Sequence, residues 1–201
     1  MADDLPIYTE GCPAAGAAAE ATSVEGELVA RVARGDLGAF ESLYRMYLPR
    51  LMRFLQQLMR RPHAIEEVIN DTMLVVWRRA ATYTGTSKVS TWIFAIAYRK
   101  GLKLLARFDD PVERTEDDAL ADADAPEGSV MRRELHEALA AAMAQVSPEQ
   151  RAVLELTYYH GCAYREIAEI MECPVDTVKT RMFHARRRLR QLLSERREDL
   201  P

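Results

Sequence analysis

The sequence predicts an all-α protein made of two small helical domains that are joined by an acidic, flexible linker. Apolar residues recur at spacings of three and four, which is typical of helices with one buried side. Residues that favour helix starts and helix stops flank these periodic segments. Charge is also unevenly distributed: residues 27–105 contain thirteen bases and six acids, whereas residues 106–130 contain two bases and nine acids. The acidic segment repels itself and is therefore predicted to be the linker.

The first block is expected to hold a leader and four helices. Residues 1–26 combine Pro, Gly, Ala and five acids without periodicity, so we expect a mobile leader. Order is expected to begin near Glu27, in a helix that stops at Gly35. Asp36 should cap the second helix, which Pro49 should kink or restart. The third and fourth helices are predicted at about 64–79 and 90–105, within a domain that spans 27–105.

Residues 131–197 are expected to form the second domain. Helices resume over 131–146, and a strong helix start follows: Ser147 suits the cap, Pro148 the first helical position, and Gln150 comes three residues after the cap. A short helix, a tight turn and a long final helix complete the domain. Their predicted positions are 164–171, 172–174 and 175 onward.

Composition and missing motifs narrow the class of protein. Three cysteines are an odd number, which points to a reducing compartment and hence to the cytoplasm. The longest apolar run, near 92–98, is shorter than the ~18 residues of a membrane span, so no membrane insertion is expected. We find no phosphate-binding Gly loop, zinc-protease helix or paired-Cys spacing, and we therefore predict no enzymatic activity, no cofactor and no metal. His160, Cys162 and Cys173 leave zinc binding or redox sensing as an alternative to buried or incidental residues.

The final helix has the pattern of the second helix of a helix-turn-helix, which enters the major groove of DNA. From Thr177 to Arg190 it carries six cations and no anion. The alternative is that these cations form only a solvated helix face. An outward Phe among such residues suits contact with a thymine methyl group. Periodicity turns Val178, Met182, Ala185, Leu189 and Leu192 inward and Lys179, Thr180, Phe183, His184, Arg187 and Arg188 outward.

This part of the chain resembles region 4 of bacterial sigma factors, the promoter-reading subunits of RNA polymerase. The pieces that carry the resemblance are SPEQR, REIAEIM, CPVDTVKTR and HARRRLRQLL, and the small extracytoplasmic-function (ECF) group is the most similar. Family members often have Ser or Thr where Ala163 stands, so this chain gives up about 1 kcal/mol of helix capping. The resemblance covers residues 27–196. It implies that Lys179, Thr180, Phe183 and His184 read the −35 promoter element, with Arg181, Arg187 and Arg188 as phosphate partners.

The third predicted helix has two different sides. Its buried side is expected to contain Ile65, Ile69, Thr72, Met73 and Val76. By resemblance the other side is region 2.2, which docks on the clamp helices of the polymerase β′ subunit, and Asp71 matches an acidic position there. The alternative is an ordinary solvated face with one exposed leucine. The predicted docking residues are Glu67, Asn70, Asp71, Leu74 and Arg78.

The segment from Thr82 to Leu105 interleaves aromatic residues with cations, a combination that holds single-stranded DNA. Trp92 and Phe94 lie at helical spacings and equally suit a protein core. The resemblance implies that the loop 82–90 captures a flipped base of the −10 element and that the following helix contacts the melted strand. The predicted −10 residues are Tyr83, Lys88, Trp92, Arg99, Lys100 and Lys103.

Together these features predict an alternative sigma factor that binds core RNA polymerase and directs initiation at promoter DNA. The resemblance implies contacts with the β′ clamp helices and the β flap, and control by an anti-sigma factor. A polymerase-independent helix-turn-helix regulator is the main alternative. In a third interpretation, the first block is purely a docking module.

Overall fold

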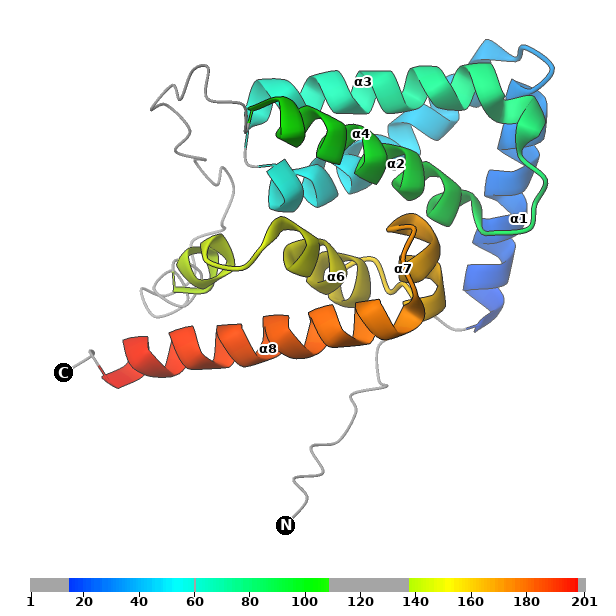
Figure 1. Ribbon diagram of the computed structural model, residues 1–201. Coiled ribbons are helices and arrows are strands. Elements are labelled where there is room, and N and C mark those ends of the chain that lie inside the picture. Colours follow the sequence, from blue (N-terminus) through cyan, green and yellow to red (C-terminus); the bar gives the residue numbers. More distant parts are fainter. Residues whose placement is uncertain (1–14, 60, 109–137, 199–201) are drawn as a thin grey trace, which may run out of the picture.

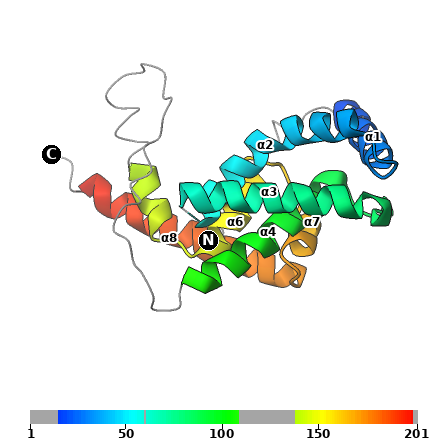
Figure 2. The same ribbon diagram turned by 90° about the horizontal axis from the view of Figure 1, so that it is seen from above.

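The computed structural model describes residues 15–59, 61–108 and 138–198. Every regular element in these ranges is helical, which confirms the predicted all-α fold. Figure 1 shows α2, α3 and α4 in an upper layer, α6 and α7 beneath them, and α8 along the lower edge. Seen from above, α1 lies at one end and α8 extends past the other (Figure 2). None of the described helices has the length and apolar character needed to cross a membrane.

The first helix begins well before the predicted start of order. α1 spans Ala15–Val32, so the prediction of a leader over residues 1–26 is wrong from residue 15 onward, while residues 1–14 lie outside the described residues. Glu25 is buried, and its Oε1 accepts a hydrogen bond from Arg50 Nη1 at 3.2 Å. The Ala-rich stretch has a high intrinsic helix propensity. Burial of Val29 and Val32 gives the helix its packing face.

α2 (Leu37–Met59) confirms the predicted helix stop and cap before it. Gly35 has a φ of 84°, the left-handed conformation expected after a helix end. Asp36 Oδ1 accepts from the Ala39 amide at 3.0 Å. The helix continues through Pro49, so of the two predicted outcomes, a kink or a restart, the restart is excluded. Proline removes one backbone donor, and the fully buried Tyr47 and Leu51 on either side hold the helix together.

The next two helices complete the first domain. α3 spans Pro62–Arg79, a short 3₁₀ turn, η1, covers Ala80–Thr82, and α4 spans Val89–Phe108. All five residues predicted for the inner side of α3 are buried. α4 runs past residue 105, so the predicted linker does not begin at residue 106. The rest of that linker, 109–130, lies outside the described residues.

The second domain contains the predicted helix-turn-helix. A helical segment over residues 138–144 precedes α6 (Pro148–Tyr158), α7 (Tyr164–Ile170) and α8 (Val175–Glu198). Ser147 caps α6 as predicted, since its hydroxyl accepts from the Gln150 amide at 3.3 Å. Ala163 has no side-chain oxygen to cap α7. Glu166 nevertheless binds the Ala163 amide at 2.7 Å, which supplies half of a capping box.

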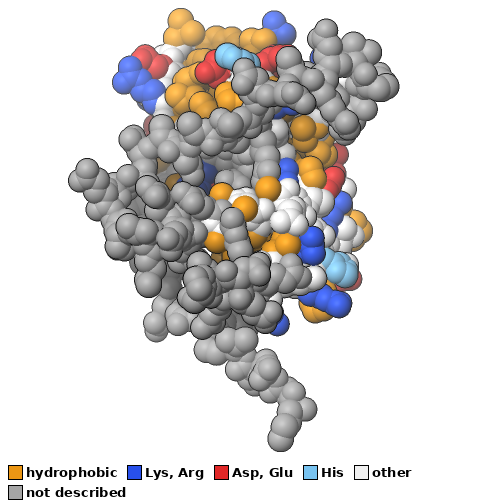
Figure 3. All heavy atoms as spheres, turned by 90° about the vertical axis from the view of Figure 1, so that its left-hand side faces the viewer, with side chains coloured by type: hydrophobic (Ala, Val, Ile, Leu, Met, Phe, Trp, Pro, Cys, Tyr) orange, Lys and Arg blue, Asp and Glu red, His pale blue; other side chains and the backbone are white. Residues whose placement is uncertain are grey.

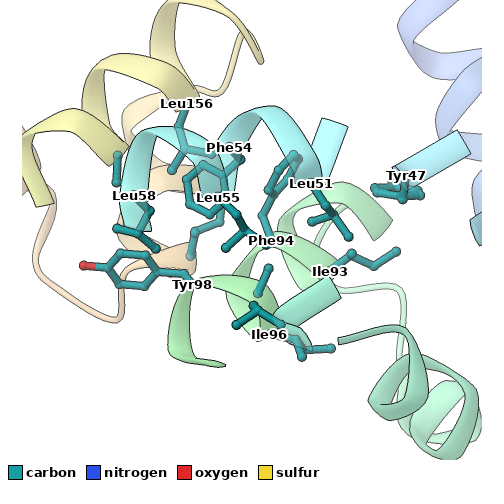
Figure 4. Packing of buried hydrophobic residues seen from close by; sticks show 14 of the residues in the cluster. Tyr47, Leu51, Phe54, Leu55, Leu58, Ile93, Phe94, Ile96, Tyr98 and Leu156 are labelled. Atoms are coloured by element: carbon teal, nitrogen blue, oxygen red, sulfur yellow. The ribbon is translucent and has the colours of Figure 1, made fainter. Parts of the chain in front are cut away.

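The two domains pack against each other. α2 contacts α6 and α4 contacts α7, and their buried residues form one continuous core. In Figure 4, Leu156 of α6 points toward Phe54 of α2. Arg151, with 6% exposure, donates to the backbone carbonyls of Gln57 and Leu58 at 2.5 and 3.3 Å. A buried cation of the second domain thus binds the carboxyl end of a helix in the first.

Gly101 marks a close approach between α4 and α2. A Cβ atom built at this position would lie 2.8 Å from Leu58 Cδ2, and the Leu58 side chain is fully buried. Side chains in a packed core have little room to move aside. A glycine inside a helix normally weakens it, so its presence here reflects the lack of space.

We expect Gly101→Leu to lower the free energy of unfolding by at least about 2 kcal/mol, because overpacking outweighs the gain in helix propensity. Ala106→Leu is the matched control, since Ala106 is exposed on the same helix. Urea unfolding followed by circular dichroism measures both. Equal stability of the two variants would contradict the close approach.

Candidate nucleic-acid interfaces

The outer side of α8 carries one continuous exposed stripe. Lys179, Thr180, Phe183, His184 and Arg187 are all exposed and recur at helical spacings. The Phe183 side chain is 61% exposed, and its ring lies edge-on to His184 with 5.5 Å between centroids. Figure 3 shows Lys, Arg and His side chains close together low on one face, below the first domain. The predicted outward residues are therefore brought together on one surface, with the exception described next.

Two of the predicted phosphate partners are held against the protein. Arg181 and Arg188 are half-buried. Arg181 Nη1 lies 3.6 Å from Cys173 Sγ, and Arg188 Nη2 donates to Gln145 Oε1 at 3.1 Å. Arg188 is therefore less exposed than the other residues predicted to face outward, because its guanidinium is engaged with Gln145. Helical periodicity sets the direction of Cβ, whereas a long side chain can carry its charged end elsewhere.

The inner side of α8 and the preceding turn fix the angle of the helix. Val178, Met182 and Ala185 are at most 2% exposed, as predicted. Glu172 takes a φ of 50° at the end of α7, and the Cys173 amide donates to the Ala168 carbonyl at 3.1 Å. This pairing closes the last turn of α7. α8 consequently leaves the turn in one defined direction.

The loop predicted to capture a −10 base packs through Tyr83 against Trp92 of α4. The rings of Tyr83 and Trp92 lie 5.2 Å apart, and both residues are half-buried. The Tyr83 hydroxyl donates to the Ser87 carbonyl at 2.5 Å. Phe94 is fully buried, so the core interpretation is correct for that residue, and Trp92 is intermediate.

The predicted −10 cations are engaged with carboxylates. Lys88 Nζ lies 2.7 Å from Glu166 Oε1, and Arg99 pairs with Glu172, so acids of α7 and its turn neutralise two of the cations. Lys100 Nζ lies 2.7 Å from Asp71 Oδ2. Lys103 is exposed on the same helix. The sequence had assigned Lys100 and Asp71 to different surfaces, and the structure joins them.

The predicted docking side of α3 is largely accessible. Glu67, Asn70, Leu74 and Arg78 are exposed, whereas Asp71 is half-buried beside Lys100. Asn70 Oδ1 accepts a hydrogen bond from the Tyr44 hydroxyl at 3.2 Å. Leu74, 44% exposed, places an apolar group among these polar residues. This side of α3 therefore presents one exposed apolar side chain among polar ones.

Comparisons with known proteins agree with this architecture. Residues 43–109 match the family "Sigma-70 region 2" and residues 136–189 match "Sigma-70, region 4". The RNA polymerase sigma-H factor of Pseudomonas aeruginosa is 30% identical over 171 residues, which cover 80% of this chain and 89% of that protein. The chain belongs to the sigma-70 family. The ECF sigma-E factor of Haemophilus influenzae is 29% identical over 170 residues, covering 79% of this sigma factor and 89% of its relative.

Solved structures share the fold of this sigma factor. CnrH in complex with the cytosolic domain of CnrY gives a TM-score of 0.64 at 21% identity, over 86% of this chain and 98% of that one. The sigma factor RpoE of Bartonella quintana, in complex with the anti-sigma factor NepR, gives a TM-score of 0.62 at 24% identity. The match covers 77% of this chain and 96% of that one. At these identities the likeness supports the helical architecture alone.

His160 lies at the junction of the two domains of the sigma factor. Its side chain is 3% exposed, and its ring lies 4.6 Å from that of Phe94 and 6.4 Å from that of Phe54. Among the described residues, no hydrogen-bond partner of His160 Nε2 is found, and the nearest carboxylate oxygen, Glu155 Oε1, is 3.9 Å away. Burial, and then the charges of Arg50 and Arg53, lower the pKa of His160 to about 4. The imidazole is therefore neutral at pH 7.

The residues considered for metal or redox chemistry do not form a ligand cluster in the described ranges of the sigma factor. No group of three or more His, Cys, Asp or Glu there is arranged to hold a metal ion. Burial, followed by the charge of Glu166, raises the pKa of Cys162 to about 11. A thiol with such a pKa stays protonated and is a poor nucleophile.

The buried neutral His160 makes stability depend on pH. Its pKa is about 4 in the folded protein and near 6.5 in the unfolded chain. The contribution of His160 to the free energy of unfolding is fully present above pH 6.5 and is lost as the pH falls toward 4. The loss amounts to about 2 kcal/mol by pH 5. Between pH 7.5 and 5 we therefore expect wild type to lose about 2 kcal/mol more unfolding free energy than His160→Phe. Urea unfolding at each pH measures this.

Two features make this comparison specific. Burial raises the pKa of Glu155, and the charge of Arg53 opposes this shift. Because Glu155 is present in both wild type and His160→Phe, its effect on the pH dependence largely cancels in the difference between them. His184→Gln, at an exposed position, should retain the wild-type profile. Parallel profiles for wild type and His160→Phe would show that the histidine is not held neutral by burial.

Proposed function

We propose that this protein is an alternative sigma factor of the ECF group, which binds core RNA polymerase and directs it to promoters by reading the −35 and −10 elements. The observation that carries this proposal is that each matched family region presents an exposed surface suited to its task. α8 offers a basic stripe with an apolar ring, and α3 offers a docking face.

The −35 element would be read by the exposed stripe of α8. Lys179 and His184 can donate to base edges, and Phe183 can contact a thymine methyl group. The Thr180 hydroxyl donates to the Asp176 carbonyl and so remains free to accept from a base. Arg187 would bind phosphate. Arg181 and Arg188 can join it only after leaving Cys173 and Gln145, so their contribution requires rearrangement of two side chains.

The −10 element would be read by the loop 82–90 and the outer side of α4. Capture of a flipped base requires the Tyr83 and Trp92 rings, which pack against each other at a tilt of 37°, to separate or to offer an outer ring face. Lys88 and Arg99 would exchange Glu166 and Glu172 for phosphates. Lys103 is already exposed, whereas Lys100 would keep or exchange its pair with Asp71. DNA contact by Lys88 and Arg99 is therefore coupled to the second domain.

The polymerase would bind the exposed side of α3 through its β′ clamp helices, with Leu74 as the apolar centre and Glu67, Asn70, Asp71 and Arg78 around it. The second domain would bind the β flap. We also propose control by an anti-sigma factor, since RpoE of Bartonella quintana was solved with one. The protein would act in the cytoplasm without catalytic activity of its own.

The packed arrangement of the domains cannot serve both promoter elements at once. The elements read by the family lie about two helical turns apart, or roughly 70 Å. Glu166 contacts Lys88 of the −10 surface, and Lys179 follows Glu166 by only 13 residues, which span at most about 45 Å. The domains must therefore separate, and polymerase would hold them apart by binding each one.

Promoter-directed transcription with purified core polymerase tests the proposed function. Wild type should initiate at promoters, and Leu74→Arg should weaken polymerase binding at least about tenfold without loss of helicity.

Lys179→Ala should weaken recognition of the −35 element by about 1–3 kcal/mol, whereas Arg187→Ala should weaken binding to all DNA sequences alike. A tight footprint over both elements by the protein alone would instead favour the polymerase-independent regulator.

The contact between the domains should restrain the free protein from binding −10 DNA. Glu166→Lys places a cation beside Lys88, which should cost about 1 kcal/mol in domain packing and raise affinity for a single-stranded −10 oligonucleotide about fivefold. Glu169→Lys makes the same charge change at an exposed site on the same helix and controls for non-specific attraction. Fluorescence anisotropy measures both. Identical gains would mean that charge alone, and not release of the contact, is responsible.

A further inference from the structure

Among the side chains of α8 that the structure describes, Asp176 is the only acid, and it lies at the amino-terminal end of the exposed stripe. Its side chain is 88% exposed in the first turn, and no other acid follows until Glu195. Counting from Asp176, the stripe residues Lys179, Phe183 and Arg187 lie three, seven and eleven positions on. Asp176 therefore belongs to the surface that the proposed function assigns to −35 DNA.

A carboxylate on that surface favours DNA binding only where it meets a hydrogen-bond donor of the DNA. Phosphates repel it, so Asp176 weakens binding wherever it faces the backbone. The first residues of a recognition helix instead contact base edges in the major groove. There a carboxylate can accept from the amino group of cytosine or adenine, whereas the oxygen edges of guanine and thymine repel it.

The structure gives Asp176 a defined neighbour. Lys179 Nζ lies 2.9 Å from Asp176 Oδ1, so a donor and an acceptor stand side by side at the head of the stripe. Asp176 also holds the first turn, because its carbonyl accepts from the Thr180 hydroxyl at 2.9 Å. Both charged side chains are well exposed, and an ion pair of this kind costs little to redirect.

We propose that Asp176 and Lys179 together read one G·C base pair of the −35 element, an inference that rests on the proposed function. Lys179 would donate to guanine O6 and N7, and Asp176 would accept from N4 of the paired cytosine. Guanine O6 and cytosine N4 share a hydrogen bond and so lie about 2.9 Å apart. The spacing of donor and acceptor on the helix therefore matches that of acceptor and donor on the base pair.

The pairing distinguishes the four base pairs by their polarity. In a reversed C·G pair, the cytosine amino group faces Lys179 and guanine O6 faces Asp176, so donor meets donor and acceptor meets acceptor. An A·T pair has the same mismatch, with the adenine amino group facing Lys179 and thymine O4 facing Asp176. A T·A pair has the favourable polarity but offers Lys179 one thymine oxygen in place of two guanine acceptors. The expected order is G·C, then T·A, with both reversed pairs strongly disfavoured.

The test is selection from a promoter library randomised across the −35 element, using core RNA polymerase with each variant. Wild type should select G·C at one position. Asp176→Asn should shift that position toward T·A about tenfold, because an amide pairs with adenine through N6 and N7. Asp176→Ala should reduce the G·C preference about tenfold. Glu169→Gln, which removes an exposed acid from α7, should leave every preference unchanged.

The same library is also presented to the sigma factor alone at low salt, which separates this inference from the proposed function. A shift seen with the free protein, but no transcription with polymerase, would support base reading and reject the initiation role. If both Asp176 variants only strengthen binding to all sequences alike, or change nothing, the inference is overturned. Asp176 would then be only a negative charge at a helix amino terminus.

Discussion

A buried guanidinium holds the two domains of this sigma factor together. Arg151 lies in the first turn of α6 and donates to carbonyls of Gln57 and Leu58 at the end of α2. Carbonyls at a helix end lack partners within the helix and carry partial negative charge, so they suit a cation that cannot be deprotonated. Arg151 also donates to the Val146 carbonyl at 2.6 Å. The position of α6, and through it that of α7 and α8, depends on this contact.

Apolar packing and exposed charge contribute differently to the junction. Phe54, Phe94, Leu156 and His160 are almost completely removed from water, and separation of the domains would expose them. The pairs of Lys88 with Glu166 and Arg99 with Glu172 lie at the rim, where ion pairs contribute little. The buried part therefore supplies stability, while the rim pairs can separate at little cost. A large partner such as polymerase can offset the cost of exposing the core.

The negative net charge of the chain is compatible with the basic stripe of α8, because the acids that pair with the first domain and the cations of the stripe lie in different segments. α7 and its turn pair two acids with cations of the first domain, whereas Lys179 and Arg187 of α8 are exposed. The two helices of one motif thus present opposite charges to two neighbours. This division lets a protein with a net charge of −4 carry a nucleic-acid surface without the whole molecule being basic.

Local patterns in the sequence determined most of the helices and the faces of the helix-turn-helix. A helix cap such as Ser147 and an inward repeat such as Val178 and Met182 involve residues only three or four positions apart. Such spacings are visible in the chain itself. The start of α1 was missed because its acids and glycines interrupt any apolar periodicity, although its alanines favour a helix.

Only the tertiary structure decided how the domains meet. The partners of Arg53 and Arg99, Glu155 and Glu172, lie 102 and 73 positions away along the chain. No periodicity links residues at such separations, so the sequence assigned Arg99 to DNA without its acidic partner. The burial of Arg151 and His160 was hidden for the same reason. Both residues look like ordinary surface residues until a second domain removes them from water.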